Sequence, residues 1–390
     1  MLSWEYPPRI IGGISRVVYN LAQELGKKGN EVHVVTCWEE GLKEEELDCH
    51  VNVHRIRTCE IDASCFINWV HHMNFSFLEG SIKLINEKGK MDIIHAHDWM
   101  TTFAARTLKH IYMIPLICTM HATEAGRNHG IHNDIQRYIN SVEWRLTYES
   151  WRVIVNSNYM KGEVRNTFQL PEDKIRVIPN GVNIEKFNNC SSDIDFRRKY
   201  AMDNEKIVFF VGRLVNEKGA HILVHAAPKI IHHYNNVKFV ITGRGPQLDY
   251  LQKIANEMNI SHKVYFTGYI SDEELVKLYK CVDVAVFPSL YEPFGIVALE
   301  GMLANVPVVV SDAGGLDEIV QHGVDGMKSY AGNSNSLADS ILEILFNPAK
   351  AEEMKKKAYE KVCSIYNWNI IAGKTEEVYN EVLKTVVISS

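Results

Sequence analysis

The chain has 390 residues, of which 46% are hydrophobic and 23% charged, and its formal net charge is −6. This length predicts two domains of about 150–200 residues each. The acidic balance excludes a broad nucleic-acid-binding face but leaves room for a local basic pocket. No apolar stretch approaches the roughly 20 residues of a transmembrane helix, and no signal peptide opens the chain. We therefore expect a cytoplasmic protein, with peripheral membrane contact left open.

Apolar, β-branched runs alternate with segments of helical periodicity along the whole chain. In the first half, the predicted strands span residues 31–36, 51–56, 92–96, 116–120, 153–156 and 176–178, with amphipathic helices over 17–28 and 132–150. In the second half, strands span 207–211, 238–242, 263–267, 283–288 and 307–311, and helices span 272–280 and 368–383. Ser271 and Glu274 predict a capping box for the first of these helices. Val/Ile-rich strands separated by helices are typical of parallel sheets covered on both faces.

Two such series in tandem predict an α/β protein with two doubly wound, Rossmann-like domains facing each other across a cleft. We expect residues 1–185 and 186–365 to form the two domains, with the polar stretch 188–195 as linker. Residues 366–390 are expected to form a helix that packs back across the first domain. The opening Met1-Leu2-Ser3-Trp4 is too short for a central strand, so the native start is expected a few residues upstream.

Ligands of open α/β sheets bind beyond the carboxyl ends of the strands, which directs attention to the loops there. Gly12-Gly13 lies directly before a helix, where free N–H groups and the helix dipole can hold an anion, although such turns are also common without a ligand. The loop lacks the G-x-G-x-x-G pattern of a dinucleotide site. The second strand also ends in Thr36-Cys37, without an acidic residue for a ribose.

The loops of the second half carry cations and glycines. Arg213 and Lys218 follow the first strand of this half, and a forked guanidinium beside a mobile ammonium suits a diphosphate. Gly243-Arg244 and Tyr269-Ile270 follow the next two strands, where they could form the wall of a nucleotide pocket. Each stretch taken alone is equally a solvated loop or a turn.

Histidines end two strands of the first half. In HAHDW, residues 95–99, His95 and His97 precede Asp98, and His121 follows the next strand. A hydrogen-bonded strand end is favoured over metal ligation for the first three, and a capping role is the alternative for His121. The eight cysteines form no C-x-x-C pair and are expected to be reduced thiols. The sequence therefore predicts no metal site.

Two glutamates flank a glycine-marked turn in YEPFGIVALE, residues 291–300. Glu292 lies before the turn, and Glu300 lies two turns into a helix-like run that starts at Ile296. Such carboxylates are either ordinary surface chemistry or two contacts to one extended ligand.

Together these stretches resemble the family-4 glycosyltransferases of the two-domain GT-B fold, whose relatives include the glycogen and starch synthases. The resemblance runs from about Trp4 to Trp368. Its strongest part is Arg213 with Lys218, then Glu292 with Glu300, and the tail SDAGGLDEIVQHGVDG at 311–326.

The resemblance implies a role for each candidate. Residues 1–185 would form the acceptor side, and 186–365 would bind a nucleoside-diphosphate sugar. Arg213 and Lys218 would hold the diphosphate, Glu292 and His121 the transferred sugar, and Glu300 the ribose. The implied catalytic residues are His121, Arg213, Lys218, Glu292 and Asp98, and the implied donor-binding residues are Gly12, Gly13, Gly243, Arg244, Tyr269, Ile270, Phe294, Gly295, Ile296 and Glu300.

The resemblance also implies a retaining reaction without cofactor or metal. As the glycosidic bond breaks, negative charge grows on the nucleoside diphosphate, and preorganised cations and helix N-termini can meet it. Metal-dependent glycosyltransferases of the other common fold use D-x-D, whereas Asp193-Ile194-Asp195 falls in the expected linker and is interpreted as a solvated turn. A front-face displacement, in which the leaving phosphate takes the acceptor's proton, is preferred over a covalent nucleophile.

The opening WEYPP and the HAHDW stretch favour the glucan-synthase side of the family, which suggests UDP-glucose or ADP-glucose as donor and an α-glucan as acceptor. Ile10 stands where bacterial glycogen and starch synthases typically carry lysine, with Arg9 adjacent. The alternative is therefore transfer to a lipid-linked or small-molecule acceptor. Acceptor contacts are expected in the loops 59–75 and 124–134, where a helix that simply packs is the competing interpretation.

Two other classes of protein stay open. A nicotinamide-dependent oxidoreductase could use the same fold, although the G-x-G-x-x-G pattern is missing. A catalytically silent nucleotide-sugar-binding protein would keep the site without turnover. Saturable NAD binding would identify the first, and unchanged donor in a turnover assay would identify the second.

Overall fold

The computed structural model of the chain describes residues 1–58, 65–188 and 193–389. Its contacts divide the chain into two compact units. Unit 1 comprises Met1–Gly181 and Trp368–Ser390, and unit 2 comprises Val182–Asn367. Residues 189–192 of the expected linker lie outside the described residues. No helix in the described part of the chain is long and apolar enough to cross a membrane.

Unit 1 is built on two groups of strands. The strands are β1 (Val32–Cys37), β2 (Glu45–Asp48), β3 (Val51–Ile56), β4 (Ile94–His97), β5 (Leu116–Met120), β6 (Arg152–Val155) and β7 (Ile175–Val177). β1 and β3 pair in parallel, and β4, β5, β6 and β7 pair in parallel in that order. β2 pairs with β3 in the antiparallel direction.

The opening residues join these two groups into one parallel series. Leu2 forms parallel bridges to Val35 of β1 and to Ala96 of β4. Its N–H donates to the His95 carbonyl at 2.8 Å, and its own carbonyl accepts from the His97 N–H at 3.0 Å. The short opening segment therefore fills the central strand position, contrary to the prediction that it is too short for a central strand. The resulting order, β3-β1-Leu2-β4-β5, is that of a Rossmann sheet, with its switch point between Leu2 and β4.

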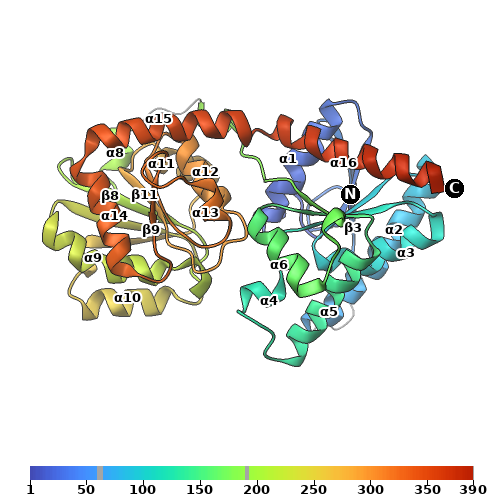
Figure 1. Ribbon diagram of the computed structural model, residues 1–390, viewed down its shortest axis with the longest axis horizontal. Helices are drawn as coiled ribbons and strands as arrows, with labels where there is room; N and C mark the ends of the chain where they lie inside the picture. The colour runs from blue at the N-terminus through green and yellow to red at the C-terminus, as the bar shows by residue number, and fades with distance from the viewer. Residues whose placement is uncertain (59–64, 189–192, 390) are drawn as a thin grey trace. The chain divides into compact units, whose positions relative to one another are not determined.

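Helices cover both faces of this sheet. They are α1 (Gly13–Lys27), α2 (Phe66–Lys88), α3 (Thr102–Tyr112), α4 (Glu124–Arg127), α5 (Asp134–Glu149), α6 (Asn158–Phe168) and α16 (Trp368–Ser389), with the 3₁₀ turns η1 (Trp99–Thr101) and η2 (Glu172–Lys174). Buried residues of α2, α3, α5 and α6 share one apolar cluster with β4, β5 and β6. α1 and α16 pack against each other (Figure 1). α16 also bonds to the sheet, because the Tyr379 hydroxyl lies 2.6 Å from Nδ1 of His95.

Unit 2 contains a six-stranded, wholly parallel sheet. Its strands are β8 (Lys206–Val211), β9 (Val237–Thr242), β10 (Val264–Gly268), β11 (Val284–Phe287), β12 (Val308–Ser311) and β13 (Met327–Ser329). Their spatial order is β10-β9-β8-β11-β12-β13. This is again the doubly wound order, with its switch point between β8 and β11. A ligand site is therefore expected at the carboxyl ends of those two strands.

Two apolar clusters cover the two faces of this second sheet. Phe209 belongs to the cluster that includes α11, α12, α13 and α15, and its neighbour Phe210 belongs to the cluster with α9, α10 and α14. Successive strand residues point to opposite faces, so both faces are buried. The helices and turns are α7 (Glu185–Asn188), α8 (Ile194–Arg197), η3 (Asn216–Lys218), α9 (Ala220–His233), α10 (Leu248–Glu257), η4 (Ser261–Lys263), α11 (Asp272–Tyr279), α12 (Ile296–Leu303), α13 (Gly315–Ile319), α14 (Ser334–Phe346) and α15 (Pro348–Ile365).

Candidate active site

In unit 2, the loops after β8 and β11 bring Lys218 and Glu292 into direct contact. The Lys218 ammonium donates to Oε2 of Glu292 at 2.7 Å, and the Ser289 hydroxyl lies 3.3 Å from the same oxygen. The two charged side chains are 23% and 9% exposed. The two strand ends that form the switch point thus present a cation and a carboxylate already held in place.

Backbone packing locks these two loops together. Gly219 follows Lys218 with φ of +69°, and a Cβ there would lie 1.9 Å from the carbonyl oxygen of Pro288. The Leu290 N–H donates to the Glu217 carbonyl at 2.8 Å. Only glycine permits this approach, and the approach sets where Lys218 stands relative to the β11 loop.

The other donor-site candidates of unit 2 lie along the same edge of the sheet. Arg213 is 62% exposed on its side chain and reaches Glu217 at 3.4 Å. The Gly243 N–H donates to the Gly268 carbonyl at 2.9 Å, which ties the ends of β9 and β10. The Arg244 guanidinium lies 5.4 Å from the centre of the exposed Tyr269 ring. Ile270 is partly buried against the apolar cluster of α11 and α12.

Glu300 lies as the spacing predicted, in the second turn of α12. Gly295 precedes the helix with φ of +114°, a conformation that favours glycine. The Phe294 side chain is buried against Tyr366, so only its backbone remains for a ligand. Glu300 is 5% exposed, and Nζ of Lys186 lies 3.6 Å from its Oε1.

In unit 1, Asp98 and His121 are joined at the carboxyl ends of β4 and β5. Oδ1 of Asp98 accepts the His121 backbone N–H at 3.1 Å, and the Asp98 N–H donates to the Thr119 carbonyl at 3.0 Å. Asp98 adopts φ of 61° and ψ of 173°. Backbone in that region is strained by about 1–3 kcal/mol for a residue other than glycine, and such strain often accompanies functional sites. Arg127 lies 3.8 Å from the other carboxylate oxygen.

The three histidines of this edge form a buried stack. The rings of His95 and His97 are 4.2 Å apart, and those of His97 and His121 are 5.5 Å apart. Burial lowers the pKa of all three, for His95 to about 3, so that they are neutral near pH 7. Within the described residues, no three His, Cys, Asp or Glu side chains gather so as to hold a metal ion.

The Gly12-Gly13 loop of unit 1 already binds a carboxylate of the chain. The N–H groups of Ile11 and Gly12 donate to Oε2 of Glu5 at 2.7 and 2.9 Å. Burial raises the pKa of Glu5, while these bonds oppose the rise. The loop has the predicted anion-binding geometry, but the Gly12 N–H is engaged by Glu5. Its contact with a donor phosphate stays a prediction.

The cation next to this loop is also engaged. Arg9 lies 2.6 Å from Glu39, and the side chain of Ile10 is 48% exposed. The loop contains no lysine, and the guanidinium of the neighbouring Arg9 forms an ion pair with Glu39.

Residues expected at the acceptor side are only partly described, because 59–64 lie outside the described residues. α2 begins at Phe66, which is 53% exposed and stacks on Trp69 at 6.1 Å. The Phe66 ring also meets Trp99 edge-on at 6.2 Å. An exposed aromatic group therefore stands beside the strand end that carries Asp98.

The D-x-D segment is exposed to solvent, as the sequence predicted, but it forms the start of a short helix and not a turn. Oδ1 of Asp193 accepts the N–H groups of Asp195 and Phe196, both at 3.0 Å, and so caps α8. Asp195 lies 3.2 Å from Arg198. Asp193 acts as a helix cap because it precedes a four-residue helix whose first N–H groups need an acceptor.

Three charged residues near the predicted site had not been expected there from the sequence: Glu5, Glu143 and Lys186. Glu143 is fully buried in α5, and both of its oxygens accept the Glu124 N–H, at 2.9 and 3.1 Å. Burial, then the charge of Asp98, raises the pKa of Glu143 well above its usual value. Glu143 could have been recognised from the sequence, because it is an acidic residue on the apolar face of a predicted helix. Glu5 and Lys186 had no such signal.

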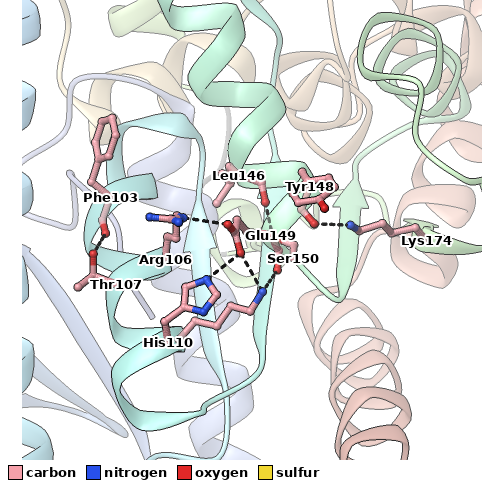
Figure 2. Close-up of polar contacts among 10 residues, drawn as sticks. Phe103, Arg106, Thr107, His110, Leu146, Tyr148, Glu149, Ser150 and Lys174 are labelled. Atoms are coloured by element: carbon pink, nitrogen blue, oxygen red, sulfur yellow. Dashed lines mark hydrogen bonds and ion pairs between the residues drawn. The ribbon is translucent and has the colours of Figure 1, made fainter.

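A separate cavity of about 570 Å³ lies at the amino ends of β5 and β6 in unit 1. It is lined by Lys109, His110, Met113, Ile114, Pro115, Tyr148, Glu149, Ser150, Trp151, Arg152, Pro171, Asp173 and Lys174. Figure 2 shows Glu149 in a polar cluster with Arg106 and His110. Its carboxylate oxygens lie 2.8 Å from Arg106, 3.0 Å from Lys109 and 3.0 Å from His110. None of the predicted site residues lines this cavity.

Glu149→Gln is expected to lower the free energy of unfolding of unit 1 by about 1–2 kcal/mol, because solvent screens the half-exposed partners Arg106 and His110. Burial opposes ionisation of Glu149, but the bonds from Arg106, Lys109 and His110 outweigh it and lower the pKa to about 2. This stabilisation is complete above the unfolded-state pKa near 4.5 and is lost as the pH falls toward 2. Urea unfolding at pH 7 measures the effect. The matched control Glu172→Gln removes an exposed ion pair with Lys161 and should leave the midpoint unchanged.

Comparison with known proteins covers both units. The family model described as glycosyl transferases group 1 matches residues 192–361, and the model described as glycosyltransferase family 4 matches residues 11–186. An uncharacterized glycosyltransferase of Methanocaldococcus jannaschii is 42% identical over 387 residues, with 97% of each chain covered. The glycogen synthase of Mycobacterium tuberculosis is 31% identical over 393 residues, which cover 97% of this chain and 93% of that protein.

Solved structures show the same fold. Sucrose-phosphate synthase from Thermosynechococcus elongatus superimposes with a TM-score of 0.82 at 25% identity, over 96% of this chain and 94% of that one. The catalytic domain of starch synthase IV from Arabidopsis thaliana, bound to ADP and acarbose, superimposes with a TM-score of 0.76 at 18% identity, over 98% of both chains. The chain therefore belongs to the family-4 glycosyltransferases of the GT-B fold and is related to the glycogen and starch synthases.

Proposed function

We propose that this glycosyltransferase transfers glucose from UDP-glucose or ADP-glucose to an α-glucan, with retention of configuration and without a metal. The choice of glucose and glucan is supported by the 31% identity to a glycogen synthase along almost the whole chain. It is also supported by the starch synthase neighbour bound to ADP and acarbose.

The observation that carries the proposal is the Lys218–Glu292 contact at the switch point of unit 2. A doubly wound sheet binds its ligand there, and the two residues have the charges that a diphosphate and a sugar hydroxyl require. Arg213 extends the cationic side at the same strand end, and its exposed guanidinium is free to turn toward a phosphate. Glu300, farther along α12, is assigned to the ribose hydroxyls, and Tyr269 with Arg244 to the base side.

In the proposed reaction, the bond from the anomeric carbon to the β-phosphate oxygen breaks while the acceptor hydroxyl attacks from the same face. The acceptor's proton passes to the leaving phosphate, and the product keeps the donor's configuration. Lys218, Arg213 and the N-terminus of α12 stabilise the growing charge of the diphosphate in place of a metal. Glu292 positions the transferred sugar. A trapped glycosyl adduct on Glu292 would overturn this mechanism.

The residues of unit 1 are assigned to the sugar and the acceptor. His121 contacts the transferred sugar near its reacting carbon, and Asp98 holds the His121 backbone through its 3.1 Å bond. The exposed Phe66, stacked on Trp69, offers a ring on which an acceptor sugar can stack.

A second acceptor class is favoured by the loop around Ile10. The glucan synthases typically carry lysine there, and Arg9 is engaged by Glu39. A small-molecule or lipid-linked acceptor, with another donor, would fit a loop that supplies less positive charge.

The test measures release of nucleoside diphosphate from UDP-glucose, ADP-glucose, UDP-GlcNAc and GDP-mannose, each with and without glycogen, in EDTA. We expect release from a glucose donor that depends on glycogen. Release that does not depend on glycogen would still support a glycosyltransferase, but it would indicate a small-molecule or lipid-linked acceptor in place of an α-glucan. Activity that appears only after adding Mg²⁺ or Mn²⁺ would overturn the metal-independent mechanism.

A further inference from the structure

Two buried histidines share one hydrogen bond at the carboxyl edge of unit 1. His97 ends β4 and is fully buried, and His121 follows β5 and is 8% exposed. Nδ1 of His97 lies 3.2 Å from Nε2 of His121, and the two rings are nearly parallel, at 19°. Burial keeps both rings neutral by lowering their pKa. One of the two nitrogens must therefore carry the proton and the other must accept it.

The remaining nitrogen of His97 decides which one donates. Nε2 of His97 is buried and has no hydrogen-bond partner among the residues that the structure describes. If His121 donated, His97 would have to carry its proton on that nitrogen, leaving a buried N–H without an acceptor. Orphaned buried N–H groups are rarer in proteins than unsatisfied acceptors. The arrangement thus favours His97 as the Nδ1–H donor.

The neighbouring histidine fixes His97 without offering it a bond. The His95 ring stacks on the His97 ring at 4.2 Å. Its own nitrogens are used by the Tyr379 hydroxyl at 2.6 Å and the Thr119 hydroxyl at 2.7 Å. The His97 ring therefore lies between two other rings, and its one hydrogen bond within the described part of the chain is to His121.

The tautomer of His97 determines that of His121. With Nε2 of His121 accepting, its single proton lies on Nδ1, the ring nitrogen left for a substrate. The backbone of His121 is fixed as well, by Asp98 at its N–H and by the Asn156 amide at 3.4 Å from its carbonyl oxygen. A neutral donor suits this place, because an imidazolium would repel an anomeric carbon that becomes oxocarbenium-like.

We propose that His97 is a positioning residue that locks His121 as its Nδ1–H tautomer, so that His121 donates a neutral hydrogen bond to an oxygen of the transferred sugar. This inference rests on the proposed contact between His121 and that sugar. It adds the atom that makes the contact and the residue that sets its protonation.

The test compares His97→Asn with His97→Leu. The Asn amide places an N–H where Nδ1 stands, whereas Leu has a similar shape and no donor. We expect His97→Leu to lower kcat about 10-fold to 100-fold, the scale for losing one preorganised donor, with the donor KM changed less than about 2-fold. His97→Asn should recover kcat to within about 3-fold of the wild type. An Asn variant as slow as the Leu variant would overturn the proposal.

A spectroscopic measurement tests the tautomer without any activity. In protein labelled with ¹⁵N-histidine, the imidazole shifts distinguish a protonated from a bare ring nitrogen, and the His121 signals are assigned by their loss in His121→Ala. We expect protonated Nδ1 and bare Nε2 at His121 in the wild type, and a shift toward protonated Nε2 in His97→Leu. Protonated Nε2 in the wild type would overturn the inference even if His97→Leu failed to fold.

Failure of this inference can be told apart from failure of the proposed function. Full activity of His121→Ala would refute the proposed contact between His121 and the sugar. The proposed role of His97 would then fail as well, because it acts through that contact. An inactive His121→Ala together with a fully active His97→Leu would leave the proposed function standing and refute only the positioning role. All variants should bind the nucleoside diphosphate product as the wild type does, because that binding is assigned to unit 2.

Discussion

Lys218→Ala is expected to lower kcat by about 100-fold or more. The Lys218 ammonium stands at the switch point of unit 2, fixed by its 2.7 Å bond to Glu292 and by the loop that Gly219 allows to approach Pro288. A preorganised cation stabilises the diphosphate charge as it develops, which lowers the barrier more than it strengthens ground-state binding. The measurement is steady-state release of nucleoside diphosphate, with kcat and donor KM determined separately.

The control variants separate lost catalysis from local disruption. Lys253→Ala removes an exposed lysine of unit 2 that lies 3.8 Å from Glu257, and it should leave kcat unchanged. Lys218→Ala also leaves the carboxylate of Glu292 buried without its cation, which is costly. The double variant Lys218→Ala, Glu292→Gln removes that charge and should remain as slow as Lys218→Ala.

Arg213→Ala should show a loss of similar size, because its guanidinium serves the same diphosphate. The Arg213 side chain is 62% exposed and bonded only loosely to Glu217, so its removal should not destabilise the fold. Turnover like that of the wild type in both Arg213→Ala and Lys218→Ala would contradict the diphosphate assignment.

The alternating pattern was enough to predict most of the two sheets. β3 and β5 begin and end at the predicted residues, and the capping box of Ser271 and Glu274 is present. Such strands are buried on both faces, so their apolar runs are unmistakable in the sequence. β2, with the sequence EELD, was missed because it is a charged edge strand whose pairing depends on its neighbour β3.

The site was predictable where one short stretch of chain fixes the geometry. The spacing of Glu292 and Glu300 around Gly295 placed one carboxylate before α12 and the other in its second turn, as observed. Contacts between segments that are distant in the sequence could not be predicted. Lys218 and Glu292 are 74 residues apart, and Glu5 reaches the Gly12 loop by a bend that no local pattern encodes.

The burial of individual polar side chains could not be predicted from the sequence either. The sequence favoured a hydrogen-bonded strand end over a metal ligand for His97, but its pattern does not show whether its ring nitrogens face solvent or another ring. The structure buries the His97 side chain fully, and among the described residues its ring has one hydrogen-bond partner, His121. The chemical role of a polar residue depends on such partners, which become visible only when the two strand ends are placed side by side.

Glu300→Ala is expected to raise the KM for the donor about 10-fold to 100-fold while changing kcat less than about 3-fold. The carboxylate is 5% exposed and lies 3.6 Å from Lys186, so it is held in one position before any donor binds. A carboxylate that accepts bonds from both ribose hydroxyls binds the ground state and the transition state equally, because the ribose does not change during transfer. Loss of such uniform binding appears in KM and leaves kcat intact.

The decisive comparison uses the 2′-deoxy analogue of the preferred donor. With the wild type, the analogue should show a raised KM, because one bond to Glu300 is missing. With Glu300→Ala, the analogue and the parent donor should have the same KM, since the partner of that hydroxyl is already gone. Glu257→Ala, which removes the exposed partner of Lys253, is the matched control and should leave both KM values at the wild-type level. The ribose assignment would be wrong if Glu300→Ala lowered kcat alone, or if this variant still had different KM values for the two donors. In that case the ion pair between Glu300 and Lys186 would stabilise α12 and would not contribute to donor binding.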